Sequence, residues 1–154
     1  MRNYYSIYRG RTLKKFTLAV FSSLMLASPA YAETVALSIE VDGIKHSTGS
    51  LAARVYNKDN WLSDSPIMTK VLPMPSNYKG GPLQIDIELE AGRYAFAVYH
   101  DVDGSGAMNK NFIGLPEEPV GLSNDHRPRF GPPRYKKAEL SINADTKKIN
   151  ITLD

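Results

Sequence analysis

The sequence predicts an all-β fold, an antiparallel β-sandwich of about six or seven strands. From residue 34 onwards apolar and polar residues alternate with a period of two, and residues typical of turns separate the short apolar runs. No segment in this part of the chain sustains the 3.6-residue period of an amphipathic helix. Helices are therefore expected to be scarce.

Residues 1–32 are expected to form a signal peptide that is cleaved after Ala32. Five basic residues precede the apolar run 16–27, and Ala30-Tyr31-Ala32 supplies small residues at the cleavage positions. The run is shorter than the roughly 20 apolar residues that cross a bilayer, so no stable membrane insertion of the mature chain is expected. Residues 33–154 are expected to form a single domain, periplasmic or secreted, which has no Cys and hence no disulfides.

The first clear strand is expected at 34–41, where Val35, Leu37, Ile39 and Val41 alternate with more polar residues. Asp42-Gly43 favours a turn, and the run 51–56 is expected to be the hairpin partner of this strand. Residues 57–81 are rich in turn-forming residues, which predicts a long loop that carries Trp61 as an aromatic plug and one short strand near 68–72.

Two further strands are expected at 83–89 and 93–100. The first alternates apolar with charged residues, which predicts one solvated face. The second is apolar on both faces, which is typical of a central strand covered on two sides. The runs 138–142 and 149–153 are expected to form a final pair of strands around a turn at 143–145.

The net charge of the mature chain gives no support for nucleic acid as a partner. All five basic residues before residue 33 would leave with the signal peptide, so a net charge of +3 becomes 14 basic against 16 acidic residues. The cluster of Arg127, Arg129, Arg134, Lys136 and Lys137 is expected to be solvated charge around a Pro-rich turn. The expected partner is an envelope protein or a small ligand.

The stretch 99–125 is the most informative part of the chain. Asp101-x-Asp103-x-Ser105-Gly106 matches the first half of a calcium-binding EF-hand loop, and the carbonyl of Ala107 would be the next ligand. The second half fails, because Phe112 stands where a bidentate Glu belongs. Glu117 or Glu118 could fold back to complete a calcium shell. The alternative is that these polar side chains only make hydrogen-bonded Asx turns.

Other candidates surround this stretch, and the ligand-binding candidates are His100, Asn111, Glu117, Asn124 and Trp61. His100 and Asp101 could converge with Asp125 and His126 on a transition metal, or His100 could be structural. Ser105 and Ser123 are potential nucleophiles only by proximity. The aromatic residues Tyr99, Trp61, Phe112, Phe130 and Tyr135 would either line a groove or plug one end of the sandwich. Asn111 and Asn124 are expected to bond to backbone groups.

Five ordered motifs indicate a family resemblance: Gly92-Arg93-Tyr94-Ala95, His100-Asp101, the run 111–118 (NFIGLPEE), Gly121-Leu122-Ser123-Asn124 and Gly131-Pro132-Pro133. With them the chain resembles the domain-of-unknown-function family 2141 of exported bacterial proteins. The resemblance implies an Ig-like or transthyretin-like β domain without an assigned activity, and it supplies no catalytic residue. Asn109 stands where members often have Asp, which weakens the calcium interpretation.

These patterns predict an exported cell-envelope binding or interaction module whose loops at 101–125 form the functional end. A calcium-stabilised structural domain is the first alternative, and an envelope hydrolase is the second. No cofactor other than calcium is indicated.

Overall fold

The computed structural model describes residues 33–112 and 116–154. These residues belong to one compact unit, and the expected signal peptide, residues 1–32, lies outside the described residues. The strands are β1 (Thr34–Asp42), β2 (Ser50–Tyr56), β3 (Met68–Pro73), β4 (Leu83–Glu90), β5 (Gly92–Asp101), β6 (Val120–Leu122), β7 (Leu140–Ile142) and β8 (Lys148–Thr152). The helical elements are one 3₁₀ turn, η1 (Ser123–Asp125), and the four-residue α1 (Tyr135–Ala138).

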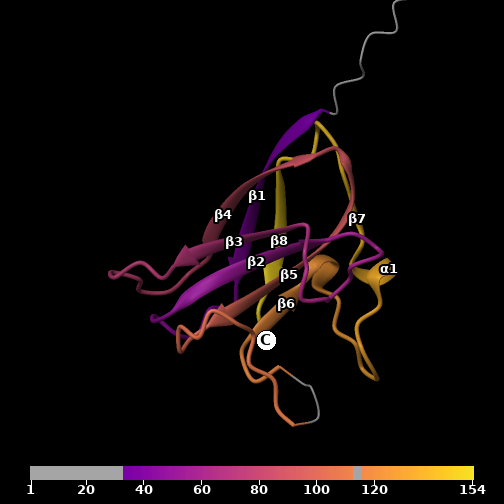
Figure 1. Ribbon diagram of the computed structural model, residues 1–154. Coiled ribbons are helices and arrows are strands. Elements are labelled where there is room, and N and C mark those ends of the chain that lie inside the picture. The colour runs from indigo at the N-terminus through magenta and orange to yellow at the C-terminus, as the bar shows by residue number, and fades with distance from the viewer. Residues whose placement is uncertain (1–32, 113–115) are drawn as a thin grey trace, which may run out of the picture. The chain divides into compact units, whose positions relative to one another are not determined.

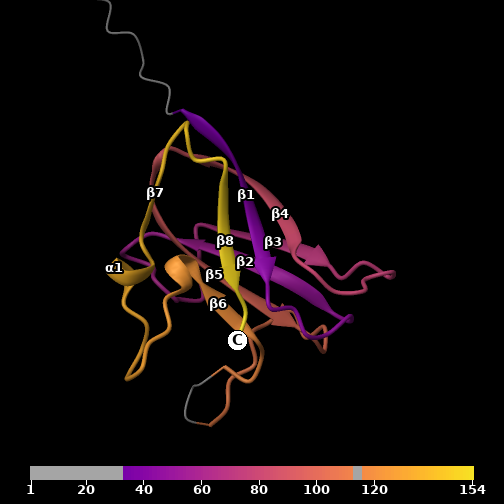
Figure 2. The ribbon, with the colours of Figure 1, turned by 180° about the vertical axis from the view of Figure 1, so that it is seen from behind.

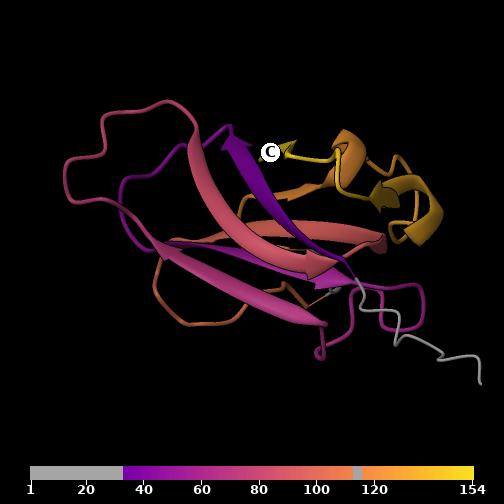
Figure 3. The same ribbon diagram turned by 90° about the horizontal axis from the view of Figure 1, so that it is seen from above.

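The strands form two packed sheets, which confirms the predicted β-sandwich. One sheet has the order β4-β1-β8, and the other has the order β3-β2-β5-β6, with β7 pairing with β5. Figure 1 shows the two sheets from the front and Figure 2 from behind, and Figure 3 shows from above that they lie one over the other. Within the described ranges, no helix has the length and apolar character that a membrane crossing requires.

The core lies between the sheets and follows the alternation of the sequence. Val35, Leu37, Ile39 and Val41 of β1 are at most 2% exposed and meet the inward-facing residues of β2, β4 and β5. The polar residues of β1 and β4 alternate outward. Because successive side chains of a strand point to opposite faces, the sequence pattern determines which face of each strand is buried.

Strand β5 is buried on both faces, as predicted for a central strand. Phe96 and Val98 belong to the core between the sheets. Ala97, on the opposite face, packs with Tyr56 and Leu122 beneath Trp61 and Leu62 of the loop 57–67. Trp61 therefore plugs the outer face of this sheet, and its indole N–H donates a hydrogen bond to the Pro133 carbonyl at 2.9 Å.

The predicted hairpin of β1 and β2 is wrong. Strand β1 pairs antiparallel with β4, whereas β2 pairs with β3 and β5 in the other sheet. Residues 43–49 carry the chain from one sheet to the other, across the roughly 10 Å that separates packed sheets. Both strands bury apolar residues in the same core, but they do so from opposite sides.

The predicted pairing of the last two strands is also wrong. Strand β7 pairs with β5, and β8 lies parallel to β1 in the other sheet, with Ile39 opposite Ile149 and Val41 opposite Ile151. The turn after β7 thus changes sheets, and Ala138 belongs to α1 rather than to a strand. Strand β6 is the one strand of the described residues that the sequence does not predict. Its three residues, with Gly121 in the middle, show no alternation of apolar and polar residues.

Candidate functional site

The polar stretch begins where β5 leaves the sheet. Asp101, the last residue of β5, is 4% exposed. Its Oδ1 accepts a hydrogen bond from the N–H of Ser105 at 3.0 Å, and its Oδ2 accepts one from the N–H of Gly106 at 2.8 Å. These bonds coil the loop back over the end of the strand. The hydrogen-bonded turns expected as one alternative are therefore present.

Asp103 lies on the exposed side of the same turn. Its Oδ1 accepts a second bond from the Ser105 N–H at 3.0 Å, and its Oδ2 accepts a bond from the Asn109 side-chain amide at 2.9 Å. The Ser105 N–H, followed by weaker contributions that include the Asn109 amide, lowers the pKa of Asp103. Asp103 is thus held as a carboxylate, the form that a metal ion needs.

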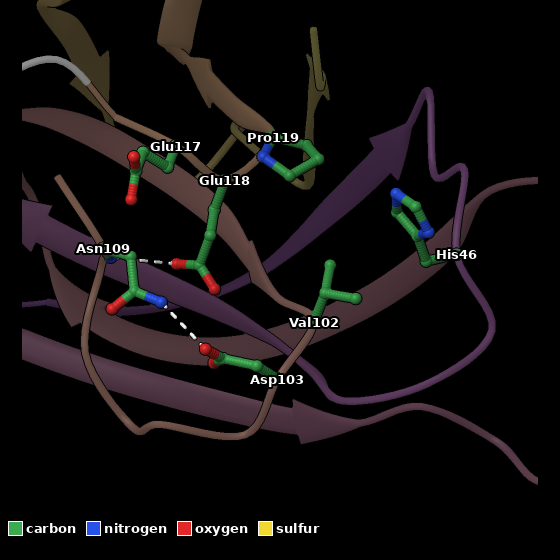
Figure 4. A pocket seen from close by; sticks show the side chains of 7 residues that line it. All are labelled: His46, Val102, Asp103, Asn109, Glu117, Glu118 and Pro119. Atoms are coloured by element: carbon green, nitrogen blue, oxygen red, sulfur yellow. Dashed lines mark hydrogen bonds between the residues drawn. The ribbon is translucent and has the colours of Figure 1, made fainter. Parts of the chain in front are cut away.

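Glu118 joins the two aspartates from the far end of the loop. The loop closes through the N–H of Glu117, which donates to the Asn109 carbonyl at 2.9 Å, and through a bridge between Lys110 and Pro116. The Asn109 N–H donates to Oε2 of Glu118 at 3.2 Å. Figure 4 shows Glu118 pointing toward Asn109 and Asp103. The sequence left open whether Glu117 or Glu118 would return, and the structure brings in Glu118.

The carboxylate of Glu118 is in an unfavourable environment. Burial raises its pKa, and the negative charges of Asp101 and Asp103 raise it further, while backbone hydrogen bonds from Asn109 and Val102 offset part of this rise. Its Oε1 is buried and makes no hydrogen bond of standard geometry with the described residues. Among the ion pairs in the described part of the chain, none includes Asp101, Asp103 or Glu118. Three carboxylates therefore share one small region without a counter-charge from the part of the chain that is described.

The geometry of this cluster suits a hard divalent cation. One carboxylate oxygen from each of Asp101, Asp103 and Glu118 lies within 4.8 Å of the other two. Asp103 and Glu118 line a cavity of about 260 Å³, together with residues that include His46, Asn109 and Glu117. Calcium binds carboxylate oxygens at roughly 2.3–2.6 Å, so one ion can contact three oxygens at this spacing. We call Asp101, Asp103 and Glu118 the acidic triad.

The other expected calcium ligands are engaged with each other. The hydroxyl of Ser105 donates a hydrogen bond of 2.9 Å to the Ala107 carbonyl. A cation that took either oxygen would have to share or break this bond. The acidic triad, rather than the full set predicted from the first half of an EF-hand, is the strongest group of candidate ligands.

The two predicted histidines, His100 and His126, do not join the triad. His100 is fully buried, its Nε2 lies 2.8 Å from the Thr48 carbonyl, and its ring lies edge-on to His46 with centroids 5.9 Å apart. His126 lines a different cavity, described below. Among the described residues, the triad is the cluster of potential metal-binding side chains. The hypothesis of a mixed His and Asp site is therefore wrong, and the structural interpretation of His100 is the one that the geometry supports.

Several other candidates have structural contacts. Asn124 has φ of +61° and its amide donates to the carbonyls of Lys137 and Glu139, both at 3.1 Å, as expected for a residue that ties a loop down. Asn111 lies half-buried in the loop, and the exposed Glu117 lines the cavity beside the triad. Trp61 packs edge-on against Tyr56 and Tyr135.

Two aromatic residues and one serine differ from expectation. Phe112 and Phe130 are 99% and 95% exposed, so neither plugs the sandwich nor lines a groove. The hydroxyl of Ser123 is fully buried, accepts a bond from the Phe96 N–H at 2.9 Å and donates to the Ala138 carbonyl. These bonds staple η1 to β5 and α1, so Ser123 is not available as a nucleophile.

The structure also identifies a residue that the sequence analysis did not single out. Arg54 lies in the middle of β2, on the outer face of the five-stranded sheet. Its guanidinium lies 5.0 Å from the centre of the Tyr99 ring and donates to the Tyr99 hydroxyl at 3.1 Å. An arginine inside an otherwise apolar strand was the signal in the sequence.

A family model for uncharacterised proteins conserved in bacteria (DUF2141) matches residues 39–150. No curated protein matches the chain, and no solved structure matches it either. The matched range includes β2 to β7, the last four residues of β1 and the first three of β8, and it contains the acidic triad. The protein therefore belongs to the DUF2141 family of uncharacterised bacterial proteins.

Proposed function

We propose that the protein is an exported, single-domain binding module of the bacterial cell envelope whose polar end loop binds calcium. The observation that carries this proposal is the return of Glu118 to Asp101 and Asp103, with one oxygen of each within 4.8 Å of the others. Calcium would compensate two of the three negative charges of the triad and link the end of β5 to the segment that leads into β6. The ion would thereby order the loop that forms this end of the sandwich.

The electrostatics favour a cation over hydrogen-bonded turns alone. Hydrogen bonds satisfy both oxygens of Asp101 and both oxygens of Asp103, but Oε1 of Glu118 is buried and makes no hydrogen bond of standard geometry within the described part of the chain. Leaving a buried oxygen of a carboxylate without a partner costs stability, and like charges nearby increase that cost. A divalent ion removes both penalties at once. Calcium is favoured over zinc because all three candidate ligands are carboxylate oxygens.

The proposal predicts that metal-free protein binds one calcium ion per chain. Titration calorimetry of wild type against Asp103→Asn and Asp101→Ala tests this prediction, with Asp145→Asn, an exposed aspartate in the turn before β8, as the matched control. The first two variants should lose the binding heat, and the control should keep it. Absence of binding by wild type at about 10 mM calcium, well above the range of extracellular calcium modules, would contradict the proposal.

The export part of the proposal is tested separately. Protein recovered from the periplasm or the medium should have the mass of residues 33–154. Full-length protein found only inside the cell would contradict it.

A further inference from the structure

A second cavity, separate from the acidic triad, lies on the outer face of the five-stranded sheet. Its volume is about 760 Å³, within the range of roughly 300–1,000 Å³ that is typical of small-molecule sites. Its walls come from the loop between β5 and β6 and from the segment between η1 and α1, both of which extend beyond the sheet in Figures 1 and 2. Arg54, Tyr56 and Leu122 contribute from β2 and β6.

Four basic side chains and three aspartates line this cavity. Arg54, Lys110, Arg127 and Arg129 line it, and the carboxylates that face them are Asp64, Asp125 and Asp154. Asp154 pairs with Arg127 at 2.7 Å, and Asp125 accepts the N–H of Thr152 at 3.1 Å. Among the ion pairs of the described residues, none contains Arg54, Lys110 or Arg129.

Arg54 is the best-positioned of these cations. Stacking on Tyr99 and the bond to the Tyr99 hydroxyl hold its guanidinium in place, so little side-chain entropy remains to be lost on binding. Its Nε is buried and has no hydrogen-bond partner among the described residues. Nε2 of His126, on another wall of the same cavity, is also buried without a partner. A fixed guanidinium that lines a cavity is a recognition group for a planar oxyanion.

The rest of the lining is largely apolar and includes Tyr56, Leu62, Met108, Leu122, Pro132 and Pro133. Inorganic anions would leave this surface uncovered. We propose that the cavity binds an organic carboxylate, with its acid group at Arg54 and its apolar body against Tyr56 and Leu122. This inference rests on the proposed role as a binding module and names a ligand class for it, at a site that does not contain the acidic triad.

The test is an NMR titration of the isotope-labelled protein with 3-phenylpropionate and, as the matched neutral probe, 3-phenylpropionamide. At constant ionic strength the carboxylate should shift the amide signals of Arg54 and Gly121 with a dissociation constant in the millimolar range expected for so small a ligand. The amide should bind at least about tenfold more weakly, because it cannot form charge-assisted hydrogen bonds with the guanidinium. Equal binding of the two probes, or no shift at about 20 mM carboxylate, would overturn the inference.

Variants locate the acid group. Arg54→Met should weaken binding of the carboxylate at least about tenfold, whereas Arg134→Gln, an exposed arginine that does not line the cavity, should leave it unchanged. If Arg54→Met does not fold, Arg129→Gln, at the exposed rim, should still weaken binding about twofold or more through lost charge. Unchanged affinity in every folded cavity variant would refute the proposal.

Two further measurements separate the possible outcomes. Inorganic phosphate alone should cause much smaller shifts, and shifts equal to those of phenylpropionate would replace the organic carboxylate by a simple anion. Calcium added to metal-free protein should shift the amide signals of Asp103 and Glu118. A failure of the calcium proposal is therefore visible separately from a failure of the carboxylate proposal, which is followed at the amide signals of Arg54 and Gly121.

Discussion

Replacement of Glu118 by Gln tests most directly whether the acidic triad binds calcium. In wild type, calcium that binds only the folded chain raises the free energy of unfolding by RT ln(1 + [Ca²⁺]/Kd). With only three carboxylates, each of which already accepts a backbone hydrogen bond, the affinity should lie in the weak range of extracellular modules, about 10⁻⁴–10⁻³ M. At about 5 mM calcium the gain is then about 1–2 kcal/mol.

For a domain of this size, that gain should raise the thermal unfolding midpoint by roughly 3–12 °C relative to protein in chelator. Glu118→Gln should abolish most of this shift, because it removes one of three anionic ligands. In chelator, the same variant should unfold at the wild-type midpoint or above it. Burial and the charges of Asp101 and Asp103 disfavour the Glu118 carboxylate there, and the neutral amide escapes both effects.

Glu117→Gln is the matched control. Glu117 is adjacent, exposed and of the same charge, but it lies outside the triad. It should keep the wild-type calcium shift, measured by differential scanning calorimetry. The reasoning is refuted if Glu118→Gln retains the full shift, or if wild type unfolds at the same temperature with calcium and with chelator.

Three more outcomes are expected. Asn109→Asp replaces the amide that donates to Asp103 by a carboxylate, so it should lower the unfolding midpoint by a few degrees in chelator yet tighten calcium binding in titration calorimetry. In chelator, urea unfolding at a series of pH values should show a contribution of Glu118 that falls as pH rises above its ordinary pKa of 4.5, because the folded chain holds the proton longer, and Glu118→Gln should remove this contribution. The lowered pKa of Asp103 acts oppositely, adding stability above its ordinary value of 3.8 that is lost as pH falls through the lowered value. Ser123→Ala should cost about 2–3 kcal/mol in urea unfolding, since it leaves the Phe96 N–H and the Ala138 carbonyl without their partner, whereas the exposed Ser141→Ala should cost less than about 0.5 kcal/mol.

Local patterns in the sequence predict the strands well because burial is a local signal here. The alternation of β1 and β4 and the two apolar faces of β5 each result from contacts on known faces of a single strand. The pairing partner of a strand, by contrast, is not specified by such local patterns. The parallel pairing of β1 with β8 joins residues more than a hundred positions apart, and no pattern within either strand specifies it.

The same distinction applies to the candidate site. The spacing of Asp101, Asp103 and Ser105 within one turn is local, and the sequence identified it. The arrival of Glu118 depends on the path of the whole loop, set by the bonds at Asn109 and the bridge from Lys110 to Pro116. Arg54 escaped notice because its role depends on Tyr99, which faces it from the neighbouring strand.

The motif Gly121-Leu122-Ser123-Asn124 illustrates how a family signature can reflect packing rather than chemistry. A Cβ at Gly121 would lie 2.5 Å from the Thr152 carbonyl, so only glycine lets β6 approach β8 this closely. Ser123 fastens η1 to β5, and Asn124 adopts a positive φ while bonding to two carbonyls around α1. Gly121, Ser123 and Asn124 therefore each have a structural reason that requires no ligand.

The loop from β5 to β6 has no such purely structural explanation. Its two ends supply Asp103 and Glu118 to the triad, and Ala107, Met108 and Lys110 line the same cavity as Arg54. A cation that fixes the loop would therefore also fix one wall of the carboxylate site. Coupling between two bound ligands is reciprocal. A carboxylate at Arg54 would then strengthen calcium binding by the same factor by which calcium strengthens carboxylate binding. If both proposals hold, the shared loop would couple the calcium site to the carboxylate site, and a carboxylate titration with and without calcium would measure that coupling.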